Sequence, residues 1–234
     1  MKVGVLFSGG KDSSYAAYRA RRDEELSCLI TLFPKSEMSY MFHFPNLAWT
    51  GLQAESMGVP QVRWSTEGVK ELELVDMREA VASAKDRFGI EGVYTGALAS
   101  VYQKTRVEGV CADLGLECVS PFWGSDPEAH LRSLLLDGFV FAVVSVSALG
   151  LDESWLGRVV DERTVDELVE LGKKYQFHVG LEGGEGETFV LDCPLFSERI
   201  ELVRTQKHWR GDSGYLEITE AKLVPKVNLR EAGA

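Results

Sequence analysis

The sequence predicts an α/β protein with a doubly wound parallel sheet, followed by a smaller domain of mixed α and β structure. Apolar runs of strand length alternate with helical patterns through the first half, which is typical of a parallel sheet covered by helices. Beyond residue 122 this alternation becomes irregular. The 234 residues are 45% hydrophobic and 26% charged, which is enough for such a core. We therefore expect a larger domain at 1–122 and a smaller one at 123–234.

The first strand and the helix that follows it begin the alternating pattern. The run KVGVLF at 2–7 is almost uniformly apolar and ends at Ser-Gly-Gly, which predicts a buried strand. Tyr15, Ala16 and Ala20 lie at helical spacing and predict a helix at 13–24. The other elements predicted for this half are strands at 26–33, 61–65, 92–95 and 117–120, and helices at 47–57, 77–88 and 100–114.

Three connecting segments fall at the carboxyl ends of these predicted strands. They are residues 8–13 after the first strand, 34–46 after the second and 96–102 after the fourth. Open α/β sheets bind their ligands at this edge. The convergence of the three segments therefore predicts a ligand site there.

The second half begins with a helix and a strand and ends in a hairpin. The predicted elements are helices at 127–137 and 164–175, strands at 139–146 and 189–191, and two strands at 200–209 and 215–224 joined by a turn at 210–214. Thr164 stands where it would cap the helix that it begins. A loop rich in glycine and glutamate is expected at 180–187.

Composition and charge exclude several classes of protein. No stretch of 18 apolar residues exists, and the first apolar run is too short for a signal peptide, so we expect a cytoplasmic protein with no membrane partner. The four cysteines form no C-x-x-C pair, which predicts reduced thiols. The net charge is −11, divided into −3 over residues 1–122 and −8 over 123–234. This charge argues against a nucleic-acid partner and favours a cationic one.

The segment SGGKDS at 8–13 has the chemistry of a phosphate-binding loop. Its glycines allow the backbone N–H groups to approach an anion, and the start of the following helix adds partial positive charge. Its serines can donate hydrogen bonds, and Lys11 adds a full positive charge. The common nucleotide-binding loop requires glycine and Ser/Thr where this chain has Val5 and Asp12. The segment is therefore a different kind of phosphate loop.

SGGKDS resembles the SGGxDS signature of the N-type ATP pyrophosphatases. In that family the loop holds the pyrophosphate part of ATP while AMP is transferred to a carbonyl or carboxylate oxygen. Three further stretches extend the resemblance: GALASVYQKTR at 96–106, EGGEGET at 182–188 and DCPLF at 192–196. Together they resemble the diphthine–ammonia ligase family in order and spacing. Pro34, His43 and Asn46 also fit the family pattern.

This resemblance implies the last step of diphthamide synthesis, on a modified histidine of translation elongation factor 2. The modified side chain, diphthine, carries a carboxylate beside a trimethylammonium group. ATP would adenylate that carboxylate with release of pyrophosphate, and ammonia would displace AMP to leave an amide. The implied fold is the HUP type, which resembles the adenine nucleotide α hydrolases. Free ammonium is the expected nitrogen donor, since no glutaminase domain fits in this chain. Mg²⁺, an archaeal origin and a homo-oligomer are further expectations.

The resemblance and the residue chemistry together name the candidate site residues. Those expected to bind ATP are Ser8, Gly9, Gly10, Lys11, Asp12, Ser13, Leu32, His43, Gly96, Ala97, Tyr102 and Gln103, with Phe33 beside Leu32. Those expected to act in catalysis are Lys11, Asp12, Glu182, Glu185 and Glu187. We expect Lys11 to meet phosphates and not the protein core, and Asp12 to serve as a Mg²⁺ ligand. The three glutamates are expected to bind the substrate's quaternary ammonium, or to bind ammonium and take its proton.

Two alternative functions remain open. A tRNA-modifying enzyme is the first, because the same loop activates tRNA bases. A local basic run supports it: Arg199, Arg204, Lys207, His208, Trp209 and Arg210. The net charge and the lack of C-x-x-C motifs argue against it, and binding to bulk tRNA would test it. The second alternative is a non-enzymatic ATP-binding or sensor protein, which conversion of ATP to AMP would exclude.

Overall fold

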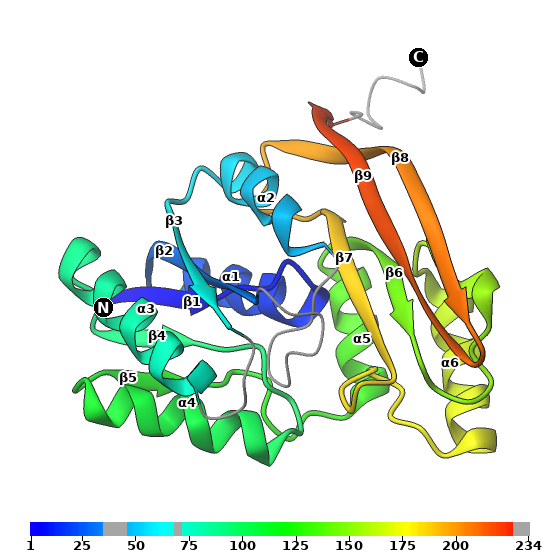
Figure 1. The fold of residues 1–234 in the computed structure, drawn as a ribbon, viewed down its shortest axis with the longest axis horizontal. Helices are drawn as coiled ribbons and strands as arrows, with labels where there is room; N and C mark the ends of the chain where they lie inside the picture. The colour runs from blue at the N-terminus through cyan, green and yellow to red at the C-terminus, as the bar shows by residue number, and fades with distance from the viewer. Residues whose placement is uncertain (35–45, 68–71, 227–234) are drawn as a thin grey trace.

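The computed structural model describes residues 1–34, 46–67 and 72–226, and it contains two β-sheets (Figure 1). The five-stranded sheet is parallel in the order β3-β2-β1-β4-β5, and the four-stranded sheet is antiparallel in the order β7-β6-β9-β8. The parallel strands are β1 (Lys2–Leu6), β2 (Glu25–Pro34), β3 (Gln61–Thr66), β4 (Gly92–Tyr94) and β5 (Glu117–Val119). The predicted doubly wound α/β sheet is thus confirmed.

Helices cover both faces of the parallel sheet because its strands carry apolar side chains on both sides. The helices of the first half are α1 (Lys11–Asp23), α2 (Thr50–Met57) after a short 3₁₀ helix (Leu47–Trp49), α3 (Leu72–Phe88) and α4 (Val101–Asp113). Ile30 of β2 packs in one apolar cluster with α3 and α4. Leu29, its neighbour on the opposite face, packs in another cluster with α1. This alternation is what a strand buried on both sides requires.

The strand order places a change of winding direction between β1 and β4. The chain runs outward through β2 and β3 on one side of β1, then returns to β4 and β5 on the other side. A crevice forms at the carboxyl ends of the strands at such a point. The loops after β1 and β4 meet there.

The second sheet contains a long hairpin and is joined to helices α5 and α6. Its strands are β6 (Val140–Val146), β7 (Gly186–Asp192), β8 (Glu198–Arg210) and β9 (Ser213–Pro225), and its helices are α5 (Pro127–Leu136) and α6 (Glu162–Tyr175), with a 3₁₀ helix at Glu153–Trp155. Gly211 adopts φ of 66° in the two-residue turn between β8 and β9, a conformation that favours glycine. In Figure 1 this hairpin lies across the molecule from α3 and α4.

The two sheets share one hydrophobic cluster. Val5 of β1, Ala16 of α1, Leu134 of α5, Phe141 of β6 and Ile218 of β9 all belong to it, and each is buried. The antiparallel sheet therefore packs on the α1 side of the parallel sheet through continuous apolar contact. The proposed division into domains at 122 and 123 stays a prediction.

Some predicted boundaries change in the structure. Helix α6 begins at Glu162, and its capping residue is Asp161, whose Oδ1 accepts a hydrogen bond of 2.8 Å from the Thr164 backbone N–H. The prediction that Thr164 caps the helix is wrong, because Asp161 has the extended backbone that a cap requires and Thr164 is buried within the first turn. Helix α3 begins five residues earlier than predicted, at Leu72.

Strand β7 begins at Gly186, three residues before the predicted start. It is longer because Glu187 and Thr188 pair with β6, a partner that is remote in the sequence. This extension brings both residues beside the phosphate loop. Within the part of the chain that the structure describes, no helix is both long and apolar enough to cross a membrane.

Candidate functional site

The loop between β1 and α1 has the backbone shape of an anion site. Gly9 adopts φ of 80°, which favours glycine, and a Cβ at this position would lie 2.3 Å from Gln53 Oε1. Gly10 is the N-cap of α1 and has no side chain to satisfy the first N–H groups of the helix. The Ser8 and Ser13 hydroxyls lie 3.1 Å apart across the loop. Backbone donors and hydroxyls therefore gather at the start of a helix, as an anion requires.

Two residues that the sequence analysis did not identify hold this loop in place. The buried Gln53 side chain of α2 donates hydrogen bonds of 2.9 Å to the carbonyl oxygens of Gly9 and Val190. The Val190 backbone N–H of β7 also donates to the Gly9 carbonyl, at 3.0 Å. The phosphate loop is thus hydrogen-bonded to the second sheet. The sequence predicts the helix at 47–57 that carries Gln53, but it does not show that this side chain is buried or what it contacts.

The loop after β4 packs directly on the start of α1. A Cβ at Gly96 would lie 2.6 Å from the carbonyl carbon of Asp12 and 2.7 Å from the Ser13 backbone nitrogen. The absence of a side chain at Gly96 therefore lets the two backbones touch. This contact follows from the pairing of β4 with β1.

Lys11 joins the phosphate loop to the acidic loop at 180–187. Its Nζ donates hydrogen bonds of 2.7 Å to Asp12 Oδ2 and to the Gly180 carbonyl oxygen, and its backbone N–H donates to Thr188 Oγ1 at 3.1 Å. Burial alone would lower the pKa of Lys11, but Asp12 and then Glu182 outweigh it and raise the pKa. The residue is only 3% exposed, so the expectation that it lies away from the protein interior is wrong.

Asp12 lies between Lys11 and a histidine that the sequence analysis did not identify. His130 Nε2 of α5 is 2.9 Å from Asp12 Oδ1, and the His130 ring is buried against Tyr15 and Phe122. Burial alone would raise the pKa of Asp12, but Lys11 and His130 hold it well below its usual range. The carboxylate is therefore charged.

Both Asp12 oxygens are engaged, since Oδ2 accepts from Lys11 and Oδ1 contacts His130. The role of Asp12 as a Mg²⁺ ligand stays a prediction. Among the residues described, no group of three or more His, Cys, Asp or Glu side chains is placed to hold a metal ion.

Glu182 of the acidic loop interacts electrostatically with both members of this charged pair. Burial and the neighbouring Asp12 charge raise the pKa of Glu182 to about 8, against the opposing effect of Lys11. A carboxyl group with this pKa exchanges protons near neutral pH. It is therefore suited to general acid–base chemistry.

The other two glutamates of the loop differ in their surroundings. Glu185 turns back onto its own loop, where its carboxylate accepts from the backbone N–H groups of Gly183 and His178. The Ser147 backbone N–H in turn donates to the Glu185 carbonyl at 2.8 Å, which ties the loop to the end of β6. Glu187 extends from β7 and lines the hollow described next. The catalytic roles of both residues stay predictions.

A hollow opens where the phosphate loop, the loop after β4 and the acidic loop meet. We call it the first hollow. The predicted site residues that line it are Ser8, Gly10, Lys11, Asp12, Ser13, Leu32, Gly96, Ala97, Gln103, Glu182 and Glu187. Among the described residues, Gly9, Phe33, Tyr102 and Glu185 do not line it. His43 lies outside the residues that the structure describes. The ring of Tyr102 is stacked against the Arg106 guanidinium, 3.4 Å from the ring centroid.

Several lining residues were missed because nothing local marks them. They include Phe7, Ile30, Met77, Thr95, Val144 and Phe189. Asn46, which fits the family pattern, also lines the first hollow. Asn46 also holds the fold together, since its side-chain amide donates to the Leu216 carbonyl and accepts from the Ile218 N–H of β9. Apolar residues of strands and helices become lining residues only when the sheets are assembled.

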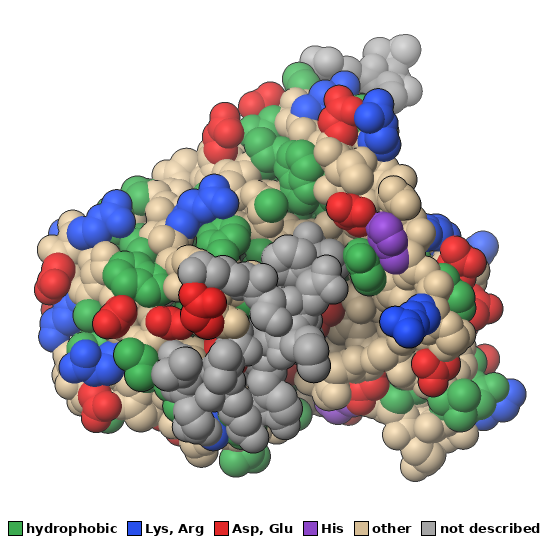
Figure 2. Space-filling model, viewed as in Figure 1, with side chains coloured by type: hydrophobic (Ala, Val, Ile, Leu, Met, Phe, Trp, Pro, Cys, Tyr) green, Lys and Arg blue, Asp and Glu red, His purple; other side chains and the backbone are tan. Residues whose placement is uncertain are grey.

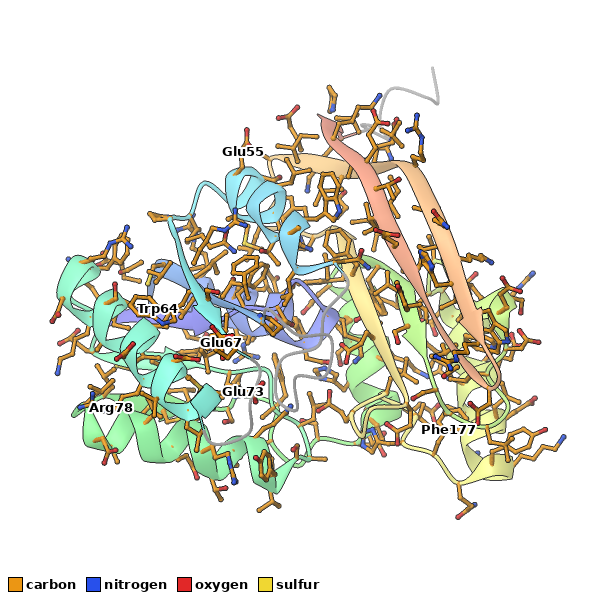
Figure 3. All side chains as sticks on the ribbon, in the orientation of Figure 1. Glu55, Trp64, Glu67, Glu73, Arg78 and Phe177 are labelled. Atoms are coloured by element: carbon orange, nitrogen blue, oxygen red, sulfur yellow. The ribbon has the colours of Figure 1, made fainter. Side chains whose placement is uncertain are left out.

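A buried carboxylate at the same edge of the parallel sheet was also missed. Glu73, on the first turn of α3, is only 1% exposed and is close in sequence to Met77, which lines the first hollow. Figure 3 labels Glu73 and also Glu67, which directly follows β3. Both residues lie at the carboxyl end of the strands.

Comparison with known proteins connects these features to one family. The family described as diphthamide synthase N-terminal domain matches residues 1–118, and the one described as diphthamide synthase C-terminal domain matches residues 126–224. A Homo sapiens protein named diphthine–ammonia ligase is 33% identical, over 97% of this chain and 94% of that protein. Its Rattus norvegicus counterpart is 36% identical, over 86% and 82%.

Two further similarities are partial, one in the coverage of the relative and the other in structural agreement. A Schizosaccharomyces pombe diphthine–ammonia ligase is 35% identical over 93% of this chain but over only 39% of its own length. A solved structure of a predicted subunit of tRNA methyltransferase from Methanocaldococcus jannaschii covers 83% of this chain and 98% of that chain, with a TM-score of 0.43 and 16% identity. A structural similarity of this size does not bear on function.

Proposed function

Because this chain belongs to the diphthamide synthase family, we propose that it converts diphthine on translation elongation factor 2 to diphthamide, using ATP and ammonium. It would thus be a ligase that forms a C–N bond and releases AMP and pyrophosphate. The observation that carries this proposal is the first hollow, where the phosphate loop and an acidic loop face one another and are joined through Lys11.

The phosphate side of the first hollow supplies what adenylation needs. A carboxylate is a poor acyl donor, since its leaving group would be oxide, whereas an acyl phosphate anhydride has AMP as its leaving group. Negative charge grows on the departing pyrophosphate as that anhydride forms. The loop amides around Gly10, the Ser13 hydroxyl and the Lys11 ammonium are the groups that would stabilise this charge.

The acidic side of the first hollow supplies what amidation needs. Ammonium must lose a proton before its nitrogen can attack the activated carbonyl carbon. Glu182, with its pKa raised to about 8, is a carboxylate suited to take that proton near neutral pH. Glu187 lines the same hollow and adds negative charge that would attract ammonium and the quaternary ammonium of diphthine.

The proposal is tested by incubating the purified protein with ATP, ammonium and diphthine-bearing elongation factor. We expect the mass of the modified histidine to change by the exchange of hydroxyl for amine, with AMP and pyrophosphate formed in equal amounts. Leaving out ammonium is the control, and it should prevent the mass change. Formation of ADP, or an unchanged histidine in the complete mixture, would contradict the proposal.

A further inference from the structure

A second hollow lies beside the first, between the turn end of the β8–β9 hairpin and the end of β6. Its lining residues on the hairpin are Lys207, His208, Trp209, Arg210, Ser213, Gly214 and Tyr215, and those on the other side are Ser145, Val146, Ser147 and Gly184. Gly184 lines both hollows. The second hollow therefore adjoins the candidate active site at Gly184.

The two hollows differ in electrostatic character. The described lining of the second hollow contains Lys207 and Arg210 and no carboxylate, whereas the first hollow contains the three carboxyl groups of Asp12, Glu182 and Glu187 against the single ammonium of Lys11. A basic hollow is unusual on a chain whose net charge is −11. Figure 2 shows Lys, Arg and His side chains on the hairpin side of the molecule, to the right of the grey residues, with Asp and Glu side chains among them. The positive charges of Lys207 and Arg210 favour the binding of an acidic partner.

The second hollow also has the side chains and the rigidity of a binding surface. Trp209, Tyr215 and Arg210 are residue types that dominate the binding energy of protein interfaces. The His208 ring stacks on Tyr215 with centroids 4.7 Å apart, and its Nε2 lies 2.8 Å from Glu217 Oε2. The Lys207 ammonium donates to the Glu153 carbonyl at 3.1 Å. These contacts order the surface before a partner binds, which lowers the entropy cost of binding.

We propose that the second hollow is the docking site of the protein substrate, and that it holds an acidic segment of the polypeptide next to the residue being modified. The inference rests on the proposed function and extends it from the reacting side chain to the protein that carries it. The first hollow has to admit the nucleotide and the end of the modified side chain, so the folded polypeptide stays outside. The second hollow is the adjoining surface where that polypeptide would be held.

The test is the double variant K207E/R210E, assayed with diphthine-bearing elongation factor. We expect the dissociation constant of the elongation factor, measured without ATP, and its KM to rise roughly tenfold or more, while kcat falls far less. Trp209→Ala should raise the same two quantities without a change of charge. The KM for ATP should stay at the wild-type value, because ATP is proposed to bind in the first hollow.

The matched control is R204E/K222E, which reverses two exposed charges on the same hairpin outside the second hollow. It should bind the elongation factor like the wild type, and both double variants should melt at similar temperatures. An unchanged dissociation constant for K207E/R210E, or loss of binding to bulk tRNA with unchanged binding of the factor, would overturn the proposal. If the wild type binds the factor but forms no amide, the proposed function fails while the binding measurements still decide the docking site.

Discussion

Lys11 shows how one side chain can serve both the fold and the chemistry. It is buried, and its ammonium joins Asp12 of the phosphate loop to Gly180 of the acidic loop. The effect of the surrounding carboxylates exceeds the effect of burial and raises the pKa of Lys11, so its side chain stays protonated and positively charged. A phosphate that enters the first hollow would compete with Gly180 and Asp12 for this ammonium. Lys11 is thus placed to respond to bound nucleotide.

We expect Lys11→Ala to abolish AMP formation and also to lower the stability of the protein. The variant leaves the Asp12 carboxylate and the Gly180 carbonyl without their cation, which costs about 1–3 kcal/mol for buried polar groups. Urea unfolding would measure the stability, and release of pyrophosphate would measure the activity. Wild-type release of pyrophosphate from the variant would show that the catalytic role assigned to Lys11 is wrong.

Glu182 should make the stability of the protein depend on pH. Its pKa is about 8 in the folded protein against 4.5 as the ordinary value, so the folded state binds the proton more tightly. The stabilisation from this group is complete below about pH 4.5 and is lost as the pH rises through about 8. The Glu182→Gln variant has no carboxyl group at this position, so it does not lose this stability as the pH rises. We therefore expect the variant to gain stability over the wild type as the pH rises from about 5 to about 8.5.

Urea unfolding at both ends of this pH range would measure the difference between the two proteins. A difference between Glu182→Gln and wild type that stays constant with pH would contradict the raised pKa. The Gln variant should also bind ATP and fail to form the amide, if Glu182 takes the proton from ammonium.

At the scale of elements, backbone contacts between loops shape the first hollow. The loop after β4 can touch the start of α1 because Gly96 has no side chain, and Gly9 leaves room for Gln53 of α2. The strand order β2-β1-β4 is what brings these segments together. Elements that are remote in the sequence therefore position the phosphate loop.

Gly96→Ala should weaken ATP binding and destabilise the protein. The new Cβ would lie 2.6 Å from the Asp12 carbonyl carbon, which is backbone and has to shift, at a cost of about 1–3 kcal/mol. Gly109→Ala in α4 is a matched control, because a Cβ there meets nothing within 4 Å. It should stabilise the helix by about 0.5–1 kcal/mol. Thermal unfolding and the KM for ATP measure both variants, and equal behaviour of the two would contradict the packing argument.

At the scale of the whole molecule, the candidate site exists only when both sheets are assembled. The phosphate loop belongs to the first half of the chain, whereas Glu182, Glu187 and Thr188 come from the second. The Val190 N–H and the shared apolar cluster hold the two halves together. A ligand bound in the first hollow would therefore contact residues from both halves of the chain.

The continuous cluster predicts that the two halves unfold in one transition. Scanning calorimetry should give a single peak whose calorimetric and van't Hoff enthalpies agree. Leu134→Ala, in the part of the cluster that α5 contributes, should lower this single midpoint by removing about 2–5 kcal/mol of stability. Two separate peaks, of which only one moves in the variant, would show that residues 1–122 and 123–234 fold independently.

Local patterns in the sequence were sufficient to predict the parallel sheet, the phosphate loop and the acidic loop. Buried strands and the SGGKDS segment each depend on neighbours in the chain, so a short window of sequence reveals them. The family resemblance likewise rests on contiguous motifs, and the comparisons confirm it.

The tertiary structure alone decided which residues meet. The pairing of His130 with Asp12, the hydrogen bonds from Gln53 to Gly9 and Val190, and the burial of Lys11 join residues from different elements. Such contacts depend on how the two sheets pack on α1, and no local spacing encodes that packing. The raised pKa of Glu182 has the same origin, since burial and a charge from another loop cause it.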